Sequence, residues 1–272
     1  MSLGPILQRI MESKRREVEA LRREISIDEL RARAADAPPA RDFRAAVTRP
    51  GGVRLIAEVK KASPSKGLIR EDFDPVAIAK AYEAGGAAAL SVLTDAPFFQ
   101  GSVEIFQAVR AAVDLPMLRK DFMIDEAQFY ESRAMGADAV LLITCMLTAR
   151  QMAEFHALAL ELGMAVLVET HSQDDVRRAL SELEPAPCLL GINNRDLNHP
   201  EMKTDLGHTE DMLPLIRQFA GVNTPPIVSE SGIYTPDDVK ELGRMRVSAV
   251  LVGESLMRQP DPGAAARELM GK

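Results

Sequence analysis

The chain has 272 residues, of which 46% are hydrophobic and 27% charged, and its formal net charge is −7. This length and composition suit one large α/β domain, or two smaller ones, with a substantial core. The acidic balance argues against a broad nucleic-acid surface, because phosphate backbones are bound by clustered Lys and Arg. A local anion site stays open, since such a site needs only a few donors.

Neither a disulfide, a metal site nor a membrane segment is predicted. Cys145 and Cys188 each lie in an apolar run, and we interpret them as buried, reduced thiols of a cytoplasmic protein. No apolar run approaches the roughly 20 residues of a spanning helix, and the charged N-terminus does not resemble a secretory signal. The histidines lack the spacing of metal ligands; they are His156, His171, His199 and His208.

Residues 1–50 are predicted to form a helical extension that packs on the rest of the chain. Apolar residues recur there at helical spacing, namely Ile6, Leu7, Ile10, Val18, Leu21 and Ile25. Glutamates among them would repel anionic lipid, so packing on the main domain is favoured over a membrane surface. We therefore expect two parts, an extension over 1–50 and a catalytic domain over 51–272.

From residue 53 onward one pattern recurs, an apolar run followed by a turn and a segment of helical period. The apolar runs, predicted as strands, are 53–59, 88–93, 115–119, 138–144, 164–169, 188–192, 225–230 and 248–253. The predicted helices are 75–84, 102–112, 125–135, 148–162, 172–183, 209–219, 236–243 and 262–270. Near-continuous apolar strands indicate a parallel sheet buried on both faces. Eight such units, without a GxGxxG after the first strand, predict a (β/α)8 TIM barrel of the α/β class.

Polar residues stand at the ends of the predicted strands. They are Glu58, Lys60, Lys120, Glu169, Asn193, Arg195 and Glu230. Because side chains alternate along a strand, Glu58 and Lys60 share the face of Ile56 and should point into the barrel mouth, where the active sites of such barrels lie. Any one of these charges has a structural ion pair as its alternative interpretation. Together they are costly to bury unpaired and suit proton transfer, which predicts an acid–base site.

Two glycine-bearing turns predict a phosphate site. SESG (229–232) and VGES (252–255) follow the seventh and eighth predicted strands, where phosphate sites of this fold are frequent. Lys60 is the expected counter-charge. After the second strand, Phe98 and Phe99 either pack under a loop or wall a flat ring in the pocket.

The motifs IAEVKKASPSKG, LTDAPFFQGS, LRKDFMID, LLIT, VLVETH, GINNRDL, VSESGI and VLVGESLM follow one another along the chain. In this order they closely resemble those of the indole-3-glycerol phosphate synthase family. The resemblance covers the whole barrel and the helical extension, and it indicates the monofunctional form rather than a fusion with phosphoribosylanthranilate isomerase. It implies ring closure of 1-(2-carboxyphenylamino)-1-deoxyribulose 5-phosphate to indole-3-glycerol phosphate, with loss of carbon dioxide and water, in tryptophan biosynthesis.

The resemblance also implies roles for particular residues. The catalytic residues would be Glu58, Lys60, Lys120, Glu169, Asn193 and Glu230. Among them, Lys120 would activate the ketone as a general acid, Glu169 would act as a base in the dehydration, and Lys60 would protonate the departing hydroxyl. The substrate-binding residues would be Ser63, Phe99, Phe122, Arg195, Leu197, Ser231, Gly232, Leu251 and Gly253. Ser231, Gly232 and Gly253 would hold phosphate, and Phe99, Phe122 and Leu197 would wall the ring.

Three alternatives stay open at this stage. A barrel lysine can form a Schiff base, as in class I aldolases; another phosphosugar barrel, such as phosphoribosylanthranilate isomerase, needs only one acid and one base. A non-catalytic phosphate binder is the third, although it predicts loss of Lys60, Lys120 or Glu169, and all are present. We expect no cofactor and a small phosphorylated substrate as the partner, without nucleic acid or membrane. We expect a monomer or weak homodimer.

Overall fold

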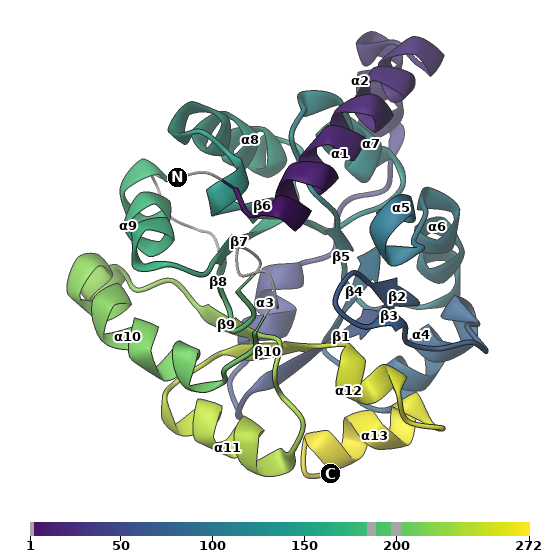
Figure 1. Ribbon diagram of the computed structural model, residues 1–272. Coiled ribbons are helices and arrows are strands. Elements are labelled where there is room, and N and C mark those ends of the chain that lie inside the picture. The colour runs from purple at the N-terminus through teal and green to yellow at the C-terminus, as the bar shows by residue number, and fades with distance from the viewer. Residues whose placement is uncertain (1–2, 184–188, 197–202) are drawn as a thin grey trace.

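A closed barrel of parallel strands forms the centre of the computed structural model, which describes residues 3–183, 189–196 and 203–272 (Figure 1). In ring order the barrel strands are β1 (Arg54–Val59), β4 (Ala89–Leu93), β5 (Met117–Lys120), β6 (Ala139–Ile143), β7 (Ala165–Thr170), β8 (Leu189–Asn193), β9 (Ile227–Glu230) and β10 (Ala249–Val252). Strands β1 and β10 pair in parallel and close the ring. The predicted (β/α)8 barrel is confirmed.

A helix follows each barrel strand on the outside of the ring (Figure 1). These helices are α4 (Pro75–Ala84), α6 (Val103–Ala112), α7 (Glu126–Ala134), α8 (Ala149–Glu161), α9 (Gln173–Glu182), α10 (Gly207–Ala220), α11 (Pro236–Arg244) and α13 (Pro262–Leu269). Their starts are fixed by side-chain caps: Asp74, Thr148 and Thr235 each accept hydrogen bonds from the first backbone amides of α4, α8 and α11.

Because side chains alternate in direction along the strands, one apolar core lies inside the ring and a second lies between the strands and the helices. On β1, Leu55, Ala57 and Val59 pack outward among the helices, whereas Ile56 packs inward. The inward row around the ring is Ile56, Ala89, Leu118, Leu141, Leu167, Leu189, Val228 and Leu251. Each large apolar side chain buried in this way contributes about 1.5–3 kcal/mol. The next inward position, two residues further along a strand, lies at the carboxyl-end mouth.

The segment before β1 closes both ends of this interior. It contains α1 (Pro5–Glu24), α2 (Ile27–Asp36) and α3 (Phe43–Thr48). Leu7 and Ile10 of α1 join the inner core at the carboxyl-end mouth, and Phe43 and Val47 of α3 join it as well. The backbone amide of Arg41, just before α3, donates to Asp138 at the start of β6, which puts α3 at the opposite end.

Short elements complete the fold. The loop after β1 carries a hairpin of β2 (Ala62–Ser63) and β3 (Gly67–Leu68), while α5 (Ala96–Phe99) and α12 (Glu254–Met257) follow β4 and β10. Two 3-10 turns span Thr144–Met146 and Gly221–Asn223.

The thiol of Cys145 is free, as predicted, but the residue is only partly buried after β6, so the predicted burial is wrong. Cys188 lies outside the described residues. Within the described ranges, no helix combines the length and the apolar character that crossing a membrane requires.

Candidate active site

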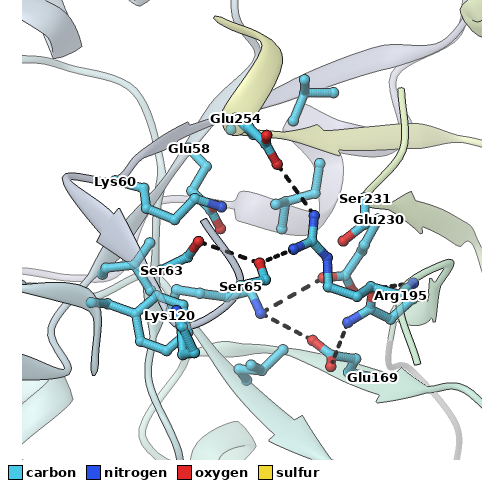
Figure 2. A pocket seen from close by; sticks show the side chains of 18 of the residues that line it. Glu58, Lys60, Ser63, Ser65, Lys120, Glu169, Arg195, Glu230, Ser231 and Glu254 are labelled. Carbon is cyan, nitrogen blue, oxygen red and sulfur yellow. Dashed lines mark hydrogen bonds and ion pairs between the residues drawn. The ribbon is translucent and has the colours of Figure 1, made fainter. Parts of the chain in front are cut away.

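A pocket with a cavity of about 120 Å³ opens at the carboxyl ends of the barrel strands (Figure 2). The predicted site residues that line it are Glu58, Lys60, Ser63, Phe99, Lys120, Phe122, Glu169, Asn193, Arg195, Glu230, Ser231, Gly232, Leu251 and Gly253. Leu197, the remaining predicted residue, lies outside the described residues. The strand parity explains this convergence, since Glu58, Lys120, Glu169 and Glu230 each stand two residues after an inward apolar side chain.

Lys120 occupies the centre of the charged cluster. Its Nζ lies 3.0 Å from Glu169 Oε2 and 3.8 Å from Glu230 Oε2, as Figure 2 shows. Burial opposes the charge on the Lys120 ammonium, but the carboxyls of Glu169 and Glu230 outweigh burial and raise its pKa above the ordinary value. Lys120 is therefore a charged acid whose proton is held by the very carboxylates it faces.

The two carboxyls beside Lys120 have opposite properties. Burial raises the pKa of Glu230 well above its usual range, and the neighbouring Glu169 raises it further, with Lys120 acting against both. Burial also disfavours a charge on Glu169, but Lys120 and a hydrogen bond of 3.0 Å from Asn193 Nδ2 lower its pKa below the ordinary value. Such a pair, with the pKa of one carboxyl raised and that of the other lowered, is expected when two carboxyls share one site.

A glycine makes room for this arrangement. Gly191 faces inward on β8, and a Cβ added there would collide with Glu230 Oε1. Gly191 was not among the predicted site residues, although a glycine at an inward strand position indicates close approach by a neighbouring group.

Glu58 and Lys60 form the second ion pair of the pocket. Gly253, after β10, lies directly against this pair: a Cβ there would stand 2.5 Å from Glu58 Oε1 and 3.1 Å from Lys60 Nζ. The glycine therefore lets the backbone approach the ammonium closely, as the predicted phosphate site requires.

The turn after β9 has an uncommon backbone. Ser231 (φ 68°) and Gly232 (φ 75°) both adopt the left-handed conformation, which costs a non-glycine residue about 1–3 kcal/mol and occurs preferentially at functional sites. A Cβ at Gly232 would also lie 2.7 Å from Thr204 Cγ2. Both residues line the pocket beside Gly253, so the two predicted glycine turns meet there.

The opposite end of the pocket is apolar. The rings of Phe99 and Phe122 lie 6.0 Å apart at an angle of 41°, and both face the cavity. Phe98, the neighbour considered with Phe99, instead packs under Arg9 of α1, with 5.9 Å between the guanidinium carbon and the ring centre. Further apolar lining comes from Ile6, Leu7, Ile10, Leu141 and Ile143, which were not among the predicted site residues.

Arg195 lies at the rim in a set of contacts that was also not predicted. It donates to Ser65 of the β2–β3 hairpin and lies 3.3 Å from Glu254 Oε2 (Figure 2). Lys66 stands 3.6 Å from the other oxygen of Glu254. Glu254 thus faces cations from two loops, and these two partners lie too far away in sequence for spacing to reveal them.

Metal ligation finds no support in the described ranges, where no group of three or more His, Cys, Asp or Glu side chains is arranged to hold an ion. His171 and His208 stack at 4.4 Å, and His171 Nδ1 lies 2.7 Å from the Asn193 carbonyl oxygen. These histidines therefore support the strand end that carries Asn193.

The fold and the pocket define the class of protein, a (β/α)8-barrel enzyme with paired lysines and carboxyls at its mouth. Solved structures of this fold agree. The 3-hexulose-6-phosphate synthase of Salmonella typhimurium has a TM-score of 0.62 at 16% identity, covering 80% of this chain and 97% of that one. At such low identity the likeness shows the fold alone.

The family is shown by sequence comparison. The model of the family described as indole-3-glycerol phosphate synthase matches residues 7–269. The protein of that name from Azoarcus sp. (strain BH72) is 49% identical over 274 residues, 99% of this chain and 100% of its own. The one from Laribacter hongkongensis is 47% identical over 270 residues, 98% and 99% of the two chains. The chain belongs to the indole-3-glycerol phosphate synthase family, as its motifs predicted.

Proposed function

We propose that this chain catalyses the conversion of 1-(2-carboxyphenylamino)-1-deoxyribulose 5-phosphate to indole-3-glycerol phosphate, carbon dioxide and water. In this reaction a ring carbon attacks the ketone, the carboxyl leaves as carbon dioxide, and the electron pair restores the aromatic ring. Water is then lost to form the indole. Family membership supports the reaction, and the layout of the pocket supports the roles below.

Lys120 is the general acid of the ring closure. It is an ammonium with two carboxyls at 3.0 and 3.8 Å, and it faces the cavity between the apolar and glycine ends. Protonating the ketone oxygen makes the carbon electrophilic, and general acids of this kind contribute about 10²–10⁴ in rate. Asn193 and Glu230 position Glu169 and order the charges around Lys120.

Glu169 is the base of the dehydration, and its lowered pKa leaves it ionised at neutral pH. Lys60 donates a proton to the departing hydroxyl, and Glu58, paired with it, completes the proton-transfer set. The proton that Glu169 removes and the one that Lys60 supplies balance the loss of one water.

The two ends of the pocket orient the substrate. Ser231, Gly232 and Gly253 hold the phosphate with Lys60 as counter-charge, helped by Ser63 and Arg195 at the rim. Phe99, Phe122 and Leu251 wall the aromatic ring. Holding ring and ketone in a near-attack geometry replaces much of the entropy cost of the reaction.

The observation that carries this proposal is Lys120 held between two carboxyls in the pocket. The test is to mix the protein with the carboxyphenylamino deoxyribulose phosphate and follow indole fluorescence. The expected result is product formation by the wild type, with loss of it in Lys120→Met. Binding of the substrate without any indole signal would refute the proposal. Borohydride added during turnover tests the Schiff-base alternative, since a reduced adduct on Lys120 would replace acid catalysis by covalent catalysis.

The organisation of the chain belongs to the same proposal. Residues 1–50 act as an extension packed on a catalytic domain of residues 51–272, supported by the inner-core positions of Leu7, Ile10, Phe43 and Val47. We expect a cytoplasmic monomer or weak homodimer, for which sedimentation velocity is the measurement.

A further inference from the structure

Lys14 is a buried lysine that the proposed reaction does not use. It lies in α1 with only 1% of its surface exposed. Its Nζ stands 2.7 Å from Asp121 Oδ1, 3.1 Å from Asp95 Oδ2 and 2.6 Å from Glu17 Oε2. Asp95 and Asp121 are themselves buried, whereas Glu17 is partly exposed on the same helix. An ammonium sealed in this way ties α1 to two separate segments of the barrel mouth.

Each aspartate controls one aromatic wall of the pocket. Asp95 follows β4 and caps α5, since its Oδ1 accepts a hydrogen bond of 2.9 Å from the Phe98 amide, next to Phe99. Asp121 directly follows Lys120, and its Oδ1 accepts a hydrogen bond of 2.8 Å from the Phe122 amide. Moving either carboxylate would therefore move Phe99 or Phe122.

The helix that carries Lys14 also supplies the third wall. Ile6, Leu7 and Ile10 of α1 line the pocket, and Leu7 and Ile10 are buried against the inner core. The Lys14 ammonium thus joins the roof of the apolar end to the segments bearing its two phenylalanines.

The charges show why the contact depends on an ammonium. Asp121 has a second cation, Arg119, with Nη2 at 3.1 Å, and a hydrogen bond of 2.5 Å from Thr94 Oγ1. Burial raises the pKa of Asp95, Lys14 lowers it and Asp121 raises it further. Removing the ammonium would leave two buried carboxylates facing each other, which proteins avoid by protonation or by movement.

We propose that Lys14 is a positioning residue for the reaction: through Asp95 and Asp121 it fixes the distance between Phe99 and Phe122 and the placement of the neighbouring Lys120. The inference rests on the proposed function for its effect on turnover. Its effect on ring binding is measurable without turnover. A failure of this inference can therefore be distinguished from a failure of the proposed function.

The experiment compares Lys14→Met and Asp95→Asn with the wild-type chain. Asparagine keeps the oxygen that caps α5 and removes only the charge. Two probes report on the two ends of the pocket, 2-aminobenzoate on the apolar end and inorganic phosphate on the glycine end. Each variant is expected to weaken 2-aminobenzoate binding about tenfold and to lower kcat, with phosphate binding within twofold of wild type. The double variant should lose no more than the worse single one, because the two residues act through one contact.

Val18→Ala is the matched control. Val18 is buried in α1 but does not line the pocket, so this change loosens the docking of the helix without touching the aspartates. It should lower the unfolding temperature and leave 2-aminobenzoate binding within twofold. The proposal would be overturned if the variants lost ring and phosphate binding equally, or if Val18→Ala lost as much ring binding as they do. Wild-type ring binding in a folded Lys14→Met would also overturn it. If Lys14→Met does not fold, Asp95→Asn alone decides, because wild-type ring binding in it refutes the inference.

Discussion

Two buried lysines, Lys14 and Lys120, have nearly the same surroundings and different access to solvent. Each ammonium faces two buried carboxyls from the ends of two different strands, Asp95 and Asp121 for Lys14, and Glu169 and Glu230 for Lys120. The side chain of Lys14 is buried between its own helix, α1, and the barrel, with 1% of it exposed. By contrast, 16% of the Lys120 side chain is exposed to the pocket.

The two clusters also differ in the pKa of their carboxyls. Arg119 assists Lys14, and the two cations outweigh burial to lower the pKa of Asp121 to about 2. Lys120 faces Glu169 and Glu230, and burial and Glu169 raise the pKa of Glu230 well above its usual range, with Lys120 acting against both. The sealed cluster around Lys14 holds structure, while the open cluster around Lys120 faces the pocket, where its groups can exchange protons with a substrate.

Lys120→Met should produce the largest effect. We expect kcat to fall about 10³-fold because the general acid is lost, while the folded structure persists since methionine suits a buried site. Indole fluorescence gives the rate, and circular dichroism checks the fold. Lys14→Met is the matched change in the sealed cluster, with an expected loss nearer tenfold. If the two lysines lose equal activity, the contrast between an open and a sealed cluster is wrong.

The carboxyls of the open cluster should also differ from each other. Glu169→Gln removes an ionised base, for which we expect a fall in kcat of about 10²-fold. Glu230→Gln replaces a carboxyl whose pKa is raised by a neutral amide of similar shape, so kcat should fall less than tenfold. Single-turnover rates at neutral pH measure both. A larger loss in Glu230→Gln would mean that Glu230 is the ionised partner of Lys120.

The sequence reveals the open cluster far better than the sealed one. Glu58, Lys120, Glu169 and Glu230 all continue an inward apolar row, so strand period and the rule for barrel active sites bring them together. Lys14 also carries a local signal, since it is spaced by four from both Ile10 and Val18 and so shares their buried face. That signal is weak, because a lysine on an amphipathic helix is normally solvated at its tip.

The spacing of residues along the sequence does not show which side chains from distant segments come into contact. Asp95 and Asp121 lie far along the chain from Lys14, and their meeting depends on where α1 docks. The same holds for Arg195 and Glu254, which meet only because two loops cross the rim. Parallel strands fix which ends converge, but the packing of a helix over the mouth follows from side-chain contacts that no local period encodes.

The contribution of a carboxyl to the unfolding free energy should change with pH in opposite directions in the two clusters. The pKa of Asp121 is lowered from 3.8 to about 2 in the folded state, so its charge contributes about 2 kcal/mol above pH 4 and this is lost as pH falls toward 2. The gap in unfolding free energy between wild type and Asp121→Asn should shrink by about this amount over that range. Urea unfolding at a series of pH values measures it, and a constant gap would contradict the prediction.

For Glu230 the contribution to stability should be lost as pH rises rather than as it falls. Its folded pKa lies above its unfolded one, so the stability linked to its proton is present below pH 4.5 and lost as pH rises. Relative to wild type, Glu230→Gln should therefore gain unfolding free energy on going from pH 4.5 to pH 7. A loss over the same range would place the ionised charge on Glu230 and remove the distinction from Asp121.

Gly253→Ala tests the glycine end of the pocket, beside the Glu58–Lys60 pair. The added methyl would press on Glu58 and Lys60, with 3.1 Å to the Lys60 ammonium, so that ammonium must shift. We expect KM to rise about tenfold, near 1.4 kcal/mol, with kcat less affected because Lys120 stands elsewhere in the pocket. The inhibition constant of inorganic phosphate should rise in parallel, while that of 2-aminobenzoate should not. If only the inhibition constant of 2-aminobenzoate rose, the glycine turns would lie at the ring-binding end of the pocket. Their assignment to phosphate would then be wrong.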